Sequence, residues 1–239
     1  TGRLPTPHEV TSATLPIPEL AEAFERLGNV AARPDKDGIF RRSTLLARYE
    51  DRPVLSLPLA MLIASDPQLR INKTDTGINI GERPVATGRR GDIILNFRGP
   101  SGTFSTYSAA AVIQSELLLQ EDEEPVVDPQ LLTGAYVFFG FTAPGLYDLR
   151  PTPLDGVFPG MEIHATAIDN LLNEDYLSPA PGVLSQLTLL VCSLLAGLGI
   201  SFSRNLLHTA VCALVTLPLP LLAGFAAYSQ LLWLPVATP

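Results

Sequence analysis

The sequence predicts an extracytoplasmic α/β domain followed by a transmembrane α-helical hairpin. Three observations indicate this organisation. All 24 acidic residues lie at or before Asp175, and the only formally charged residue after it is Arg204. Two uncharged runs follow that boundary, and each is long enough to cross a bilayer as a helix. Before the boundary, helical patterns alternate with short apolar runs, an order typical of α/β domains.

Residues 1–18 are rich in Pro and Thr and predict an extended lead-in to a domain that spans residues 19–178. An amphipathic helix is expected to begin at Pro18 and to stop before Gly28. Its predicted apolar face consists of Leu20, Ala23, Phe24 and Leu27.

The next segment, residues 29–50, predicts two strands around an Asp-Lys-Asp-Gly turn, in which Asp37 and Gly38 suit a positive φ. The Asp35-x-Asp37-Gly38 spacing also resembles part of an EF-hand calcium loop. A third acidic or amide position before the glycine is missing, so the turn is the favoured interpretation.

The remaining pattern alternates between helices and strands, and residues 72–90 are assigned no regular element. The helix near Ser56 has that serine as its cap, with a proline in its first turn. Met161, His164 or Ala165, Ile168 and Leu172 are expected along one side of the last helix. The predicted helices are 56–65, 108–119 and 159–172, and the predicted strands are 93–97 and 135–140.

Residues 183–203 and 206–232 are the two predicted spans, and Pro218 and Pro220 should kink the second. The alternative is a helical hairpin buried in a soluble protein, although such helices rarely lack a polar face. By the positive-inside rule, Arg204 places the short loop in the cytoplasm and the acidic domain outside. Residues 233–239 are then expected to lead to a third span, and an upstream export signal is expected before Thr1.

Several features of the two spans add to this interpretation. Tyr176, Tyr228 and Trp233 lie at plausible interfacial depths, where aromatic anchors gather. Gly197 and Gly199, with their small neighbours, offer a patch for helix contact. Both cysteines, Cys192 and Cys212, fall inside the spans, so the sequence predicts no disulfide and no cysteine-based zinc site in the outer domain.

Two long Gly- and Pro-rich loops follow the predicted strands 93–97 and 135–140, where ligands of α/β domains tend to bind. The ligand-binding candidates in and after these loops are Asn96, Arg98, Asp148 and His164. The Arg98 guanidinium suits a carboxylate or phosphate, or a structural salt bridge to an acid such as Asp148. Asn96 suits a bond to the loop backbone, and Asp148 a ligand contact or a brace of its own loop.

Catalytic, cofactor and metal sites are not predicted. Ser101 stands in Gly-Pro-Ser-Gly, which lacks the Gly-x-Ser-x-Gly elbow of a hydrolase nucleophile. His164 and Asp169, considered with Glu162 as metal ligands, are five residues apart and diverge on a helix. The first 175 residues hold 15 of the 16 basic residues and all 24 acidic ones, a net charge of −9 that argues against a nucleic-acid partner.

Five motifs, in this order, identify a family resemblance: "DKDGIFRRSTL", "LSLPLAMLIA", "GDIILNFRGPSGTFSTYS", "YVFFGFTAPGLYDLRPTP" and "FPGMEIHATAIDNLL". Together with the uncharged spans they closely resemble the second class of CHASE domain, from about residue 19 to residue 172. The resemblance implies a sensory region of a bacterial receptor, followed by three spans and a cytoplasmic nucleotide cyclase, histidine kinase or Ser/Thr kinase. It also implies a homodimer and a domain whose first segment lies upstream, and it transfers no ligand-binding residue.

The resulting hypothesis is a membrane sensor that binds a small-molecule or envelope ligand. Two alternatives stay open. A membrane-anchored envelope module would bind another protein through its acidic face without signalling output, and an exterior hydrolase would use Ser101 or an acid pair.

Overall fold

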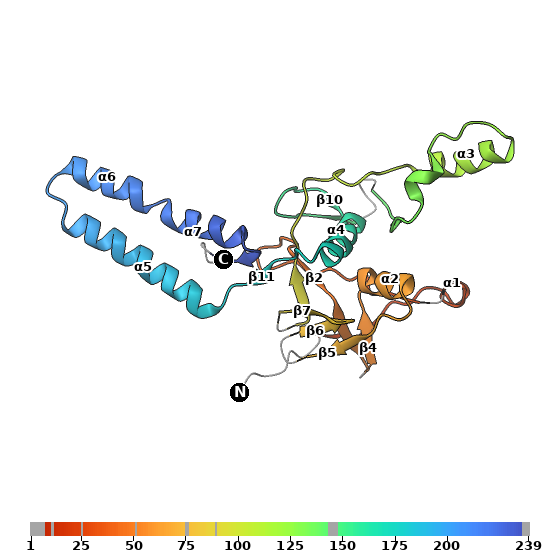
Figure 1. Cartoon of the computed structure of the whole chain (residues 1–239), viewed down its shortest axis with the longest axis horizontal. Helices are drawn as coiled ribbons and strands as arrows, with labels where there is room; N and C mark the ends of the chain where they lie inside the picture. The colour runs from red at the N-terminus through yellow and green to blue at the C-terminus, as the bar shows by residue number, and fades with distance from the viewer. Residues whose placement is uncertain are drawn as a thin grey trace.

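The computed structural model describes residues 8–10, 12–24, 26–50, 52–74, 77–88, 90–142 and 148–235. It contains a mixed helix and strand domain and a pair of apolar helices that extends away from it (Figure 1). The strands are short and form several small sheets, and most pairs are antiparallel.

The first half of the domain is mostly strands. β1 (His8–Val10) pairs in parallel with β3 (Leu46–Tyr49), which forms an antiparallel hairpin with β4 (Arg52–Leu55). β2 (Arg42–Thr44) pairs antiparallel with β8 (Asp92–Ile94). β5 (Ile71–Lys73), β6 (Gly77–Ile80) and β7 (Arg83–Ala86) form a further antiparallel sheet.

The second half contains the longer helices. α3 (Ala109–Gln120) and the 3-10 helix η1 (Pro129–Leu132) lie on an arm that projects from the domain (Figure 1). β9 (Leu149–Arg150) and β10 (Phe158–Pro159) pair just before α4 (Gly160–Asn173). β11 (Ser178–Pro179) then leads into α5 (Gly182–Ser201), and it pairs in parallel with β12 (Leu232–Trp233).

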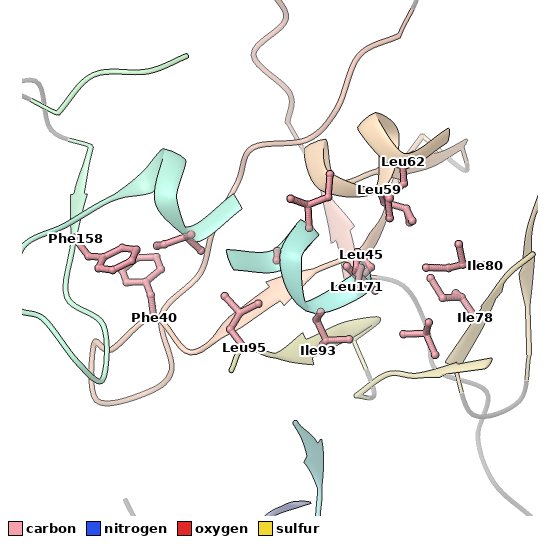
Figure 2. Packing of buried hydrophobic residues seen from close by; sticks show 14 residues of the cluster. Phe40, Leu45, Leu59, Leu62, Ile78, Ile80, Ile93, Leu95, Phe158 and Leu171 are labelled. Atoms are coloured by element: carbon pink, nitrogen blue, oxygen red, sulfur yellow. The ribbon is translucent and has the colours of Figure 1, made fainter. Parts of the chain in front are cut away.

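The core lies between α2 (Leu57–Ser65), α4 and the strands β2, β6 and β8 (Figure 2). Local signals explain α2, because the Ser56 hydroxyl accepts a hydrogen bond from the Leu59 N–H and Pro58 lies in the first turn. The most buried large residues of the core include Leu45, Leu59, Ile93, Phe158 and Ile163.

Several predicted elements are confirmed. Helices form near Ser56, Ser108 and Pro159, and each of the two serines accepts a cap bond from a backbone N–H. The turn near Asp35 is also confirmed, with a Gly38 N–H···O=C Asp35 bond of 3.0 Å and a φ of +84° at Gly38. Asp37 was expected to share that positive φ, and this was wrong.

Other predicted elements differ in extent. α1 (Pro18–Ala23) ends before Phe24, whose side chain is exposed, so the helix is shorter than predicted. Residues 29–34 form no strand and only an isolated bridge at Asn29, because the hairpin uses β3 and β4 instead. Residues 72–90, for which no element was predicted, contribute to the sheet of β5, β6 and β7. The predicted strand 93–97 ends at Ile94.

The predicted buried strand at residues 135–140 is wrong. The segment has no strand partner among the described residues, and Phe139 is 80% exposed. Tyr136 and Phe138 alone turn toward the core. The buried face of α4 also differs from the predicted one, since Ile163, Ala167 and Leu171 are buried there, together with the predicted Ile168, whereas the predicted Leu172 is exposed.

Two apolar stretches, Gly182–Ser201 and Leu206–Tyr228, could cross a membrane by length and composition. The second consists of α6 (Leu206–Thr216) and α7 (Leu219–Tyr228), and the interruption predicted at Pro218 is confirmed. α5 runs alongside α6 and α7 (Figure 1). None of the residues in either stretch is buried within the described chain, whereas the core helix of a soluble protein is mostly buried.

Candidate functional site

A pair of asparagines joins the end of β8 to α4. The Asn96 backbone N–H donates to Asn170 Oδ1 at 2.8 Å, and Asn170 Nδ2 donates to the Asn96 carbonyl at 3.0 Å. Asn170 is fully buried. Its side-chain amide therefore takes the place of a strand partner for Asn96, the second residue after β8, and it satisfies backbone groups that would be costly to bury unpaired.

Arg98 lies two residues further along, with its guanidinium between two carboxylates. Its Nε donates to Asp169 Oδ2 at 2.6 Å, and its Nη1 and Nη2 donate to the two oxygens of Asp175 at 2.6 and 2.8 Å. The fork geometry is the strong form of this interaction. The hydrogen bonds that Arg98 donates to Asp175, and then the one that it donates to Asp169, raise the pKa of Arg98 above its usual value, against the effect of burial.

The same cluster reaches both ends of the apolar helix pair. Asn96 Nδ2 donates to the Asp175 carbonyl at 3.2 Å, and Asp175 lies just before β11, which leads into α5. The hydroxyl of Tyr228, the last residue of α7, donates to Asn96 Oδ1 at 2.7 Å. The Leu177 N–H also donates to the Ile94 carbonyl at 2.9 Å. The end of β8 is therefore attached to the point where the chain enters and leaves the helix pair.

These contacts correct the prediction for Arg98. Its salt-bridge partners are Asp169 and Asp175, not Asp148. Asp148 lies beside the first residue of α4, and its carbonyl accepts a hydrogen bond from the Gly160 N–H at 2.8 Å. A Cβ at Gly160 would meet the Asp148 carboxylate, so a larger residue there would force that side chain to shift.

Asp148 and His164 form a second pair of candidates, near the first turns of α4. The Asp148 carboxylate is partly exposed, and it makes a long ion pair with Arg150 at 3.6 Å. His164 is half-buried, and its Nδ1 has no hydrogen-bond partner among the described residues. Among the residues that the structure describes, no hydrogen bond joins Asp148 or His164 to Asn96 or Arg98. The four predicted residues therefore lie in two separate groups.

Burial lowers the pKa of His164, whereas the nearby backbone of Val30 and the charge of Asp148 raise it. Burial dominates, so the unfolded chain binds the proton more tightly than the folded one. The free energy of unfolding should therefore be insensitive to this group above about pH 6.5 and should fall as the pH drops below it.

We expect His164→Gln to lose less stability than the unmodified chain between about pH 7.5 and about pH 5.5, by a few degrees in melting temperature. Thermal unfolding followed by circular dichroism measures this difference. His208→Gln, at an exposed position in α6, should keep the full acid sensitivity. An equal loss in the unmodified chain and His164→Gln would contradict the assignment.

The Gly99–Gly102 turn is clamped onto α4 by a buried acid. The Ser101 hydroxyl donates to Glu162 Oε1 at 2.9 Å, and the Gly102 N–H donates to Oε2 at 3.0 Å. The Ser101 N–H donates to Asp155 at 3.2 Å. Both carboxylate oxygens of Glu162 are therefore used to hold this turn, one by the Ser101 hydroxyl and one by the Gly102 backbone. The arrangement favours the structural interpretation of this loop.

The acidic turn near Asp35 is an ion-pair network. Arg41 donates to both oxygens of Asp37, at 2.9 and 2.7 Å, and Arg42 bridges Asp35 and Asp92 at 3.0 and 2.9 Å. The hydrogen bonds from Arg41, followed by that from the Ile39 N–H, lower the pKa of Asp37 to about 2. Among the described residues, no group of three or more His, Cys, Asp or Glu is arranged to hold a metal ion.

Sequence reasoning named Asn96 and Arg98 but missed their partners. Asn170, Asp175 and the hydroxyl of Tyr228 carry no local signal, because each depends on segments more than 70 residues apart coming together. Glu162 and Asp169 were considered only as metal ligands, and each is instead an acceptor for the β8–α3 loop. A helical periodicity centred on Ile163 and Ala167 would have placed Glu162 beside the buried stripe.

Comparison with known families decides the identity of the domain. The family model of the CHASE2 domain matches residues 5–199. The chain belongs to the CHASE2 domain family. Neither a curated protein nor a solved structure matches the chain.

CHASE2 is an extracellular, non-catalytic sensory domain of signalling receptors. The matched range covers the whole mixed helix and strand domain described above and most of α5. The predicted resemblance to the second class of CHASE domain is therefore confirmed. For this chain, a sensory role and an association with signal transduction follow from the family, and the two apolar helices fit a membrane location.

Proposed function

We propose that this chain is the sensor and membrane region of a bacterial transmembrane receptor. In this proposal the CHASE2 domain lies outside the cytoplasm, and α5 and α6–α7 cross the membrane as a hairpin. A ligand signal passes through them to a cytoplasmic nucleotide cyclase, histidine kinase or Ser/Thr kinase. The chain itself carries no catalytic role.

The observation that carries the proposal is the attachment of both helix ends to one polar cluster. Asn96 and Arg98 hold Asp175 before α5, and Asn96 also holds Tyr228 at the end of α7. A change in the position of β8 relative to α4 would therefore move the outer ends of both helices together. Such a displacement is the kind of two-state element that a ligand biases through its different affinities for the two states.

The four candidate residues divide between two roles in this proposal. Arg98 is occupied by two carboxylates and Asn96 by three partners. We therefore assign both to the relay, by which we mean the contacts that connect the domain to the outer ends of α5 and α7. Asp148 and His164 retain unused hydrogen-bonding capacity. We therefore place the contacts to a small-molecule or envelope ligand at Asp148 and His164.

The direction of β12 supports a third span in the full receptor. β12 runs parallel to β11, which leads directly into α5. A chain that continued along β12 would therefore point toward the same side as α5. For a receptor homodimer, Gly197 is the more open of the two glycines of α5, since a Cβ there would meet no atom within 4 Å, whereas Gly199 faces Cys212.

Hydrogen exchange of the full chain in lipid bilayers tests the relay. The Leu177, Ser178 and Ala180 N–H groups donate across the junction to the carbonyls of Ile94, Leu231 and Trp233, and should be protected. We expect Arg98→Met to raise exchange at these three amides by about tenfold, because the anchor of Asp175 is lost while α2 stays protected.

Arg83→Met is the matched control. Arg83 also pairs with an acid beyond α4, Glu174 at 3.2 Å, but both side chains are more than half exposed. Unchanged protection of the three amides in Arg98→Met would contradict the proposed relay.

The orientation of the hairpin has its own test. In the same bilayers, a cysteine at Arg204 in a background without Cys192 and Cys212 should react only with a reagent supplied to the cytoplasmic side.

A further inference from the structure

A cavity of about 900 Å³ lies where the domain meets the outer end of the helix pair. One wall is the charged turn, with Asp35, Lys36 and Asp37 followed by Arg41 and Arg42. The opposite wall is formed by α7, β12 and the residues beside them. A cavity of this size accommodates a ligand as large as a drug molecule, and its two walls differ sharply in polarity.

The charged wall has one uncommitted charge. Both carboxylate oxygens of Asp37 accept from Arg41, and those of Asp35 accept from Arg41 and Arg42. Lys36 stands between the two acids and has no hydrogen bond or ion pair with any described residue. The carboxylates and the guanidinium groups neutralise each other, so an anion is the ligand that this wall can still pair.

The apolar wall consists of aliphatic and aromatic side chains. Leu221 and Phe225 come from α7, and Trp233 comes from β12. Gly224 on the same helix adds no side chain to fill the space. A ligand that satisfies both walls has an anionic group next to Lys36 and hydrocarbon next to α7.

We propose that this cavity binds a phospholipid, with its phosphate paired to Lys36 and the upper part of its acyl chains against α7. This inference rests on the proposed membrane location, which puts the outer end of α7 at the lipid headgroups. The bound lipid would lie between the charged turn, which Arg42 ties to Asp92 of β8, and the end of α7 that Tyr228 ties to Asn96. Headgroup composition would then act on the same junction as the ligand signal.

Trp233 provides a direct test, because it is the only tryptophan in the chain and it lines the cavity. The full chain is placed in phosphatidylcholine vesicles that contain a small, equal fraction of phosphatidylglycerol or phosphatidylcholine brominated on the acyl chains. We expect brominated phosphatidylglycerol to quench Trp233 emission about fivefold more strongly per lipid, because its net negative charge is attracted to Lys36.

Lys36→Gln should remove this preference. The only other lysine, Lys73, is exposed in β5 and does not line the cavity, so Lys73→Gln is the matched control and should keep it. Added inorganic phosphate should leave the quenching unchanged, since a lipid also gains from the apolar wall. Loss of quenching on adding phosphate would identify a site for free anions and would overturn the proposal that the cavity binds a phospholipid.

Equal quenching by both brominated lipids, in the unmodified chain and in Lys36→Gln alike, would also overturn the lipid site. Flotation of the vesicles separates this result from a failure of the proposed function. A chain that does not float with the vesicles refutes the membrane location and the lipid site together. A chain that floats without a lipid preference refutes the lipid site alone.

Discussion

Replacing Asn170 by leucine is expected to lower the free energy of unfolding of the domain by about 2–4 kcal/mol, because two backbone groups of Asn96 would lose their partner. The Asn170 side chain is fully buried, and it accepts from the Asn96 N–H and donates to the Asn96 carbonyl. Leucine has a similar volume but no polar atom. The measurement is chemical denaturation of the full chain in mild detergent, followed by circular dichroism.

Two further variants make the result specific. Asn170→Asp keeps the acceptor for the Asn96 N–H, but when ionised it buries a carboxylate against the Asn96 carbonyl, so its loss should be smaller at acidic pH, where the protonated carboxyl can donate, than at neutral pH. Asn173→Leu makes the same change one turn later on an exposed part of α4, and it should stay within about 0.5 kcal/mol of the unmodified chain. Equal losses at positions 170 and 173 would show that the asparagine pair does not hold the end of β8.

Short-range signals predicted the helices well. The serines that precede α2 and α3 bond to N–H groups three residues later, so the sequence next to each helix contains its start signal. The two apolar stretches and the break at Pro218 are equally local, since they depend on uninterrupted hydropathy and on the missing N–H of proline. The family resemblance added the sensory role, which no local pattern contains.

Long-range pairing could not be predicted in the same way. Arg98 was a candidate for an ion pair, but the chain offers 24 acidic residues, and only the packing of α4 against β8 selects Asp169 and Asp175. The prediction of the buried face of α4 was wrong for a related reason. Neighbouring stripes on one helix are both apolar enough to be buried, and the strands opposite it decide in favour of Ile163 and Ala167.

The strands were the least predictable elements, because a short apolar run specifies neither its partner nor its burial. Residues 135–140 contain as many apolar side chains as a core strand. They pair with no strand among the described residues, and only Tyr136 and Phe138 of this run pack against the core. The β5–β6–β7 sheet was missed for the opposite reason, since its turn-rich sequence has few consecutive apolar residues.

Two phenylalanines test this distinction between the buried and the exposed apolar segments. Phe158 is 1% exposed, and its ring meets that of Phe97 edge to face with the centroids 5.5 Å apart. Phe158→Ala should therefore lower the free energy of unfolding by about 3–5 kcal/mol, through lost burial and the cavity left behind. Denaturant titration of the full chain in mild detergent measures the loss.

Phe139→Ala is the matched variant, because it removes the same ring from a position that is 80% exposed. It should change the free energy of unfolding by no more than about 0.5 kcal/mol. A buried strand at residues 135–140 would instead make the two losses comparable, and the apolar run would then belong to the core. The ratio of the two losses thus measures directly whether packing or sequence hydrophobicity selects the core of this CHASE2 domain.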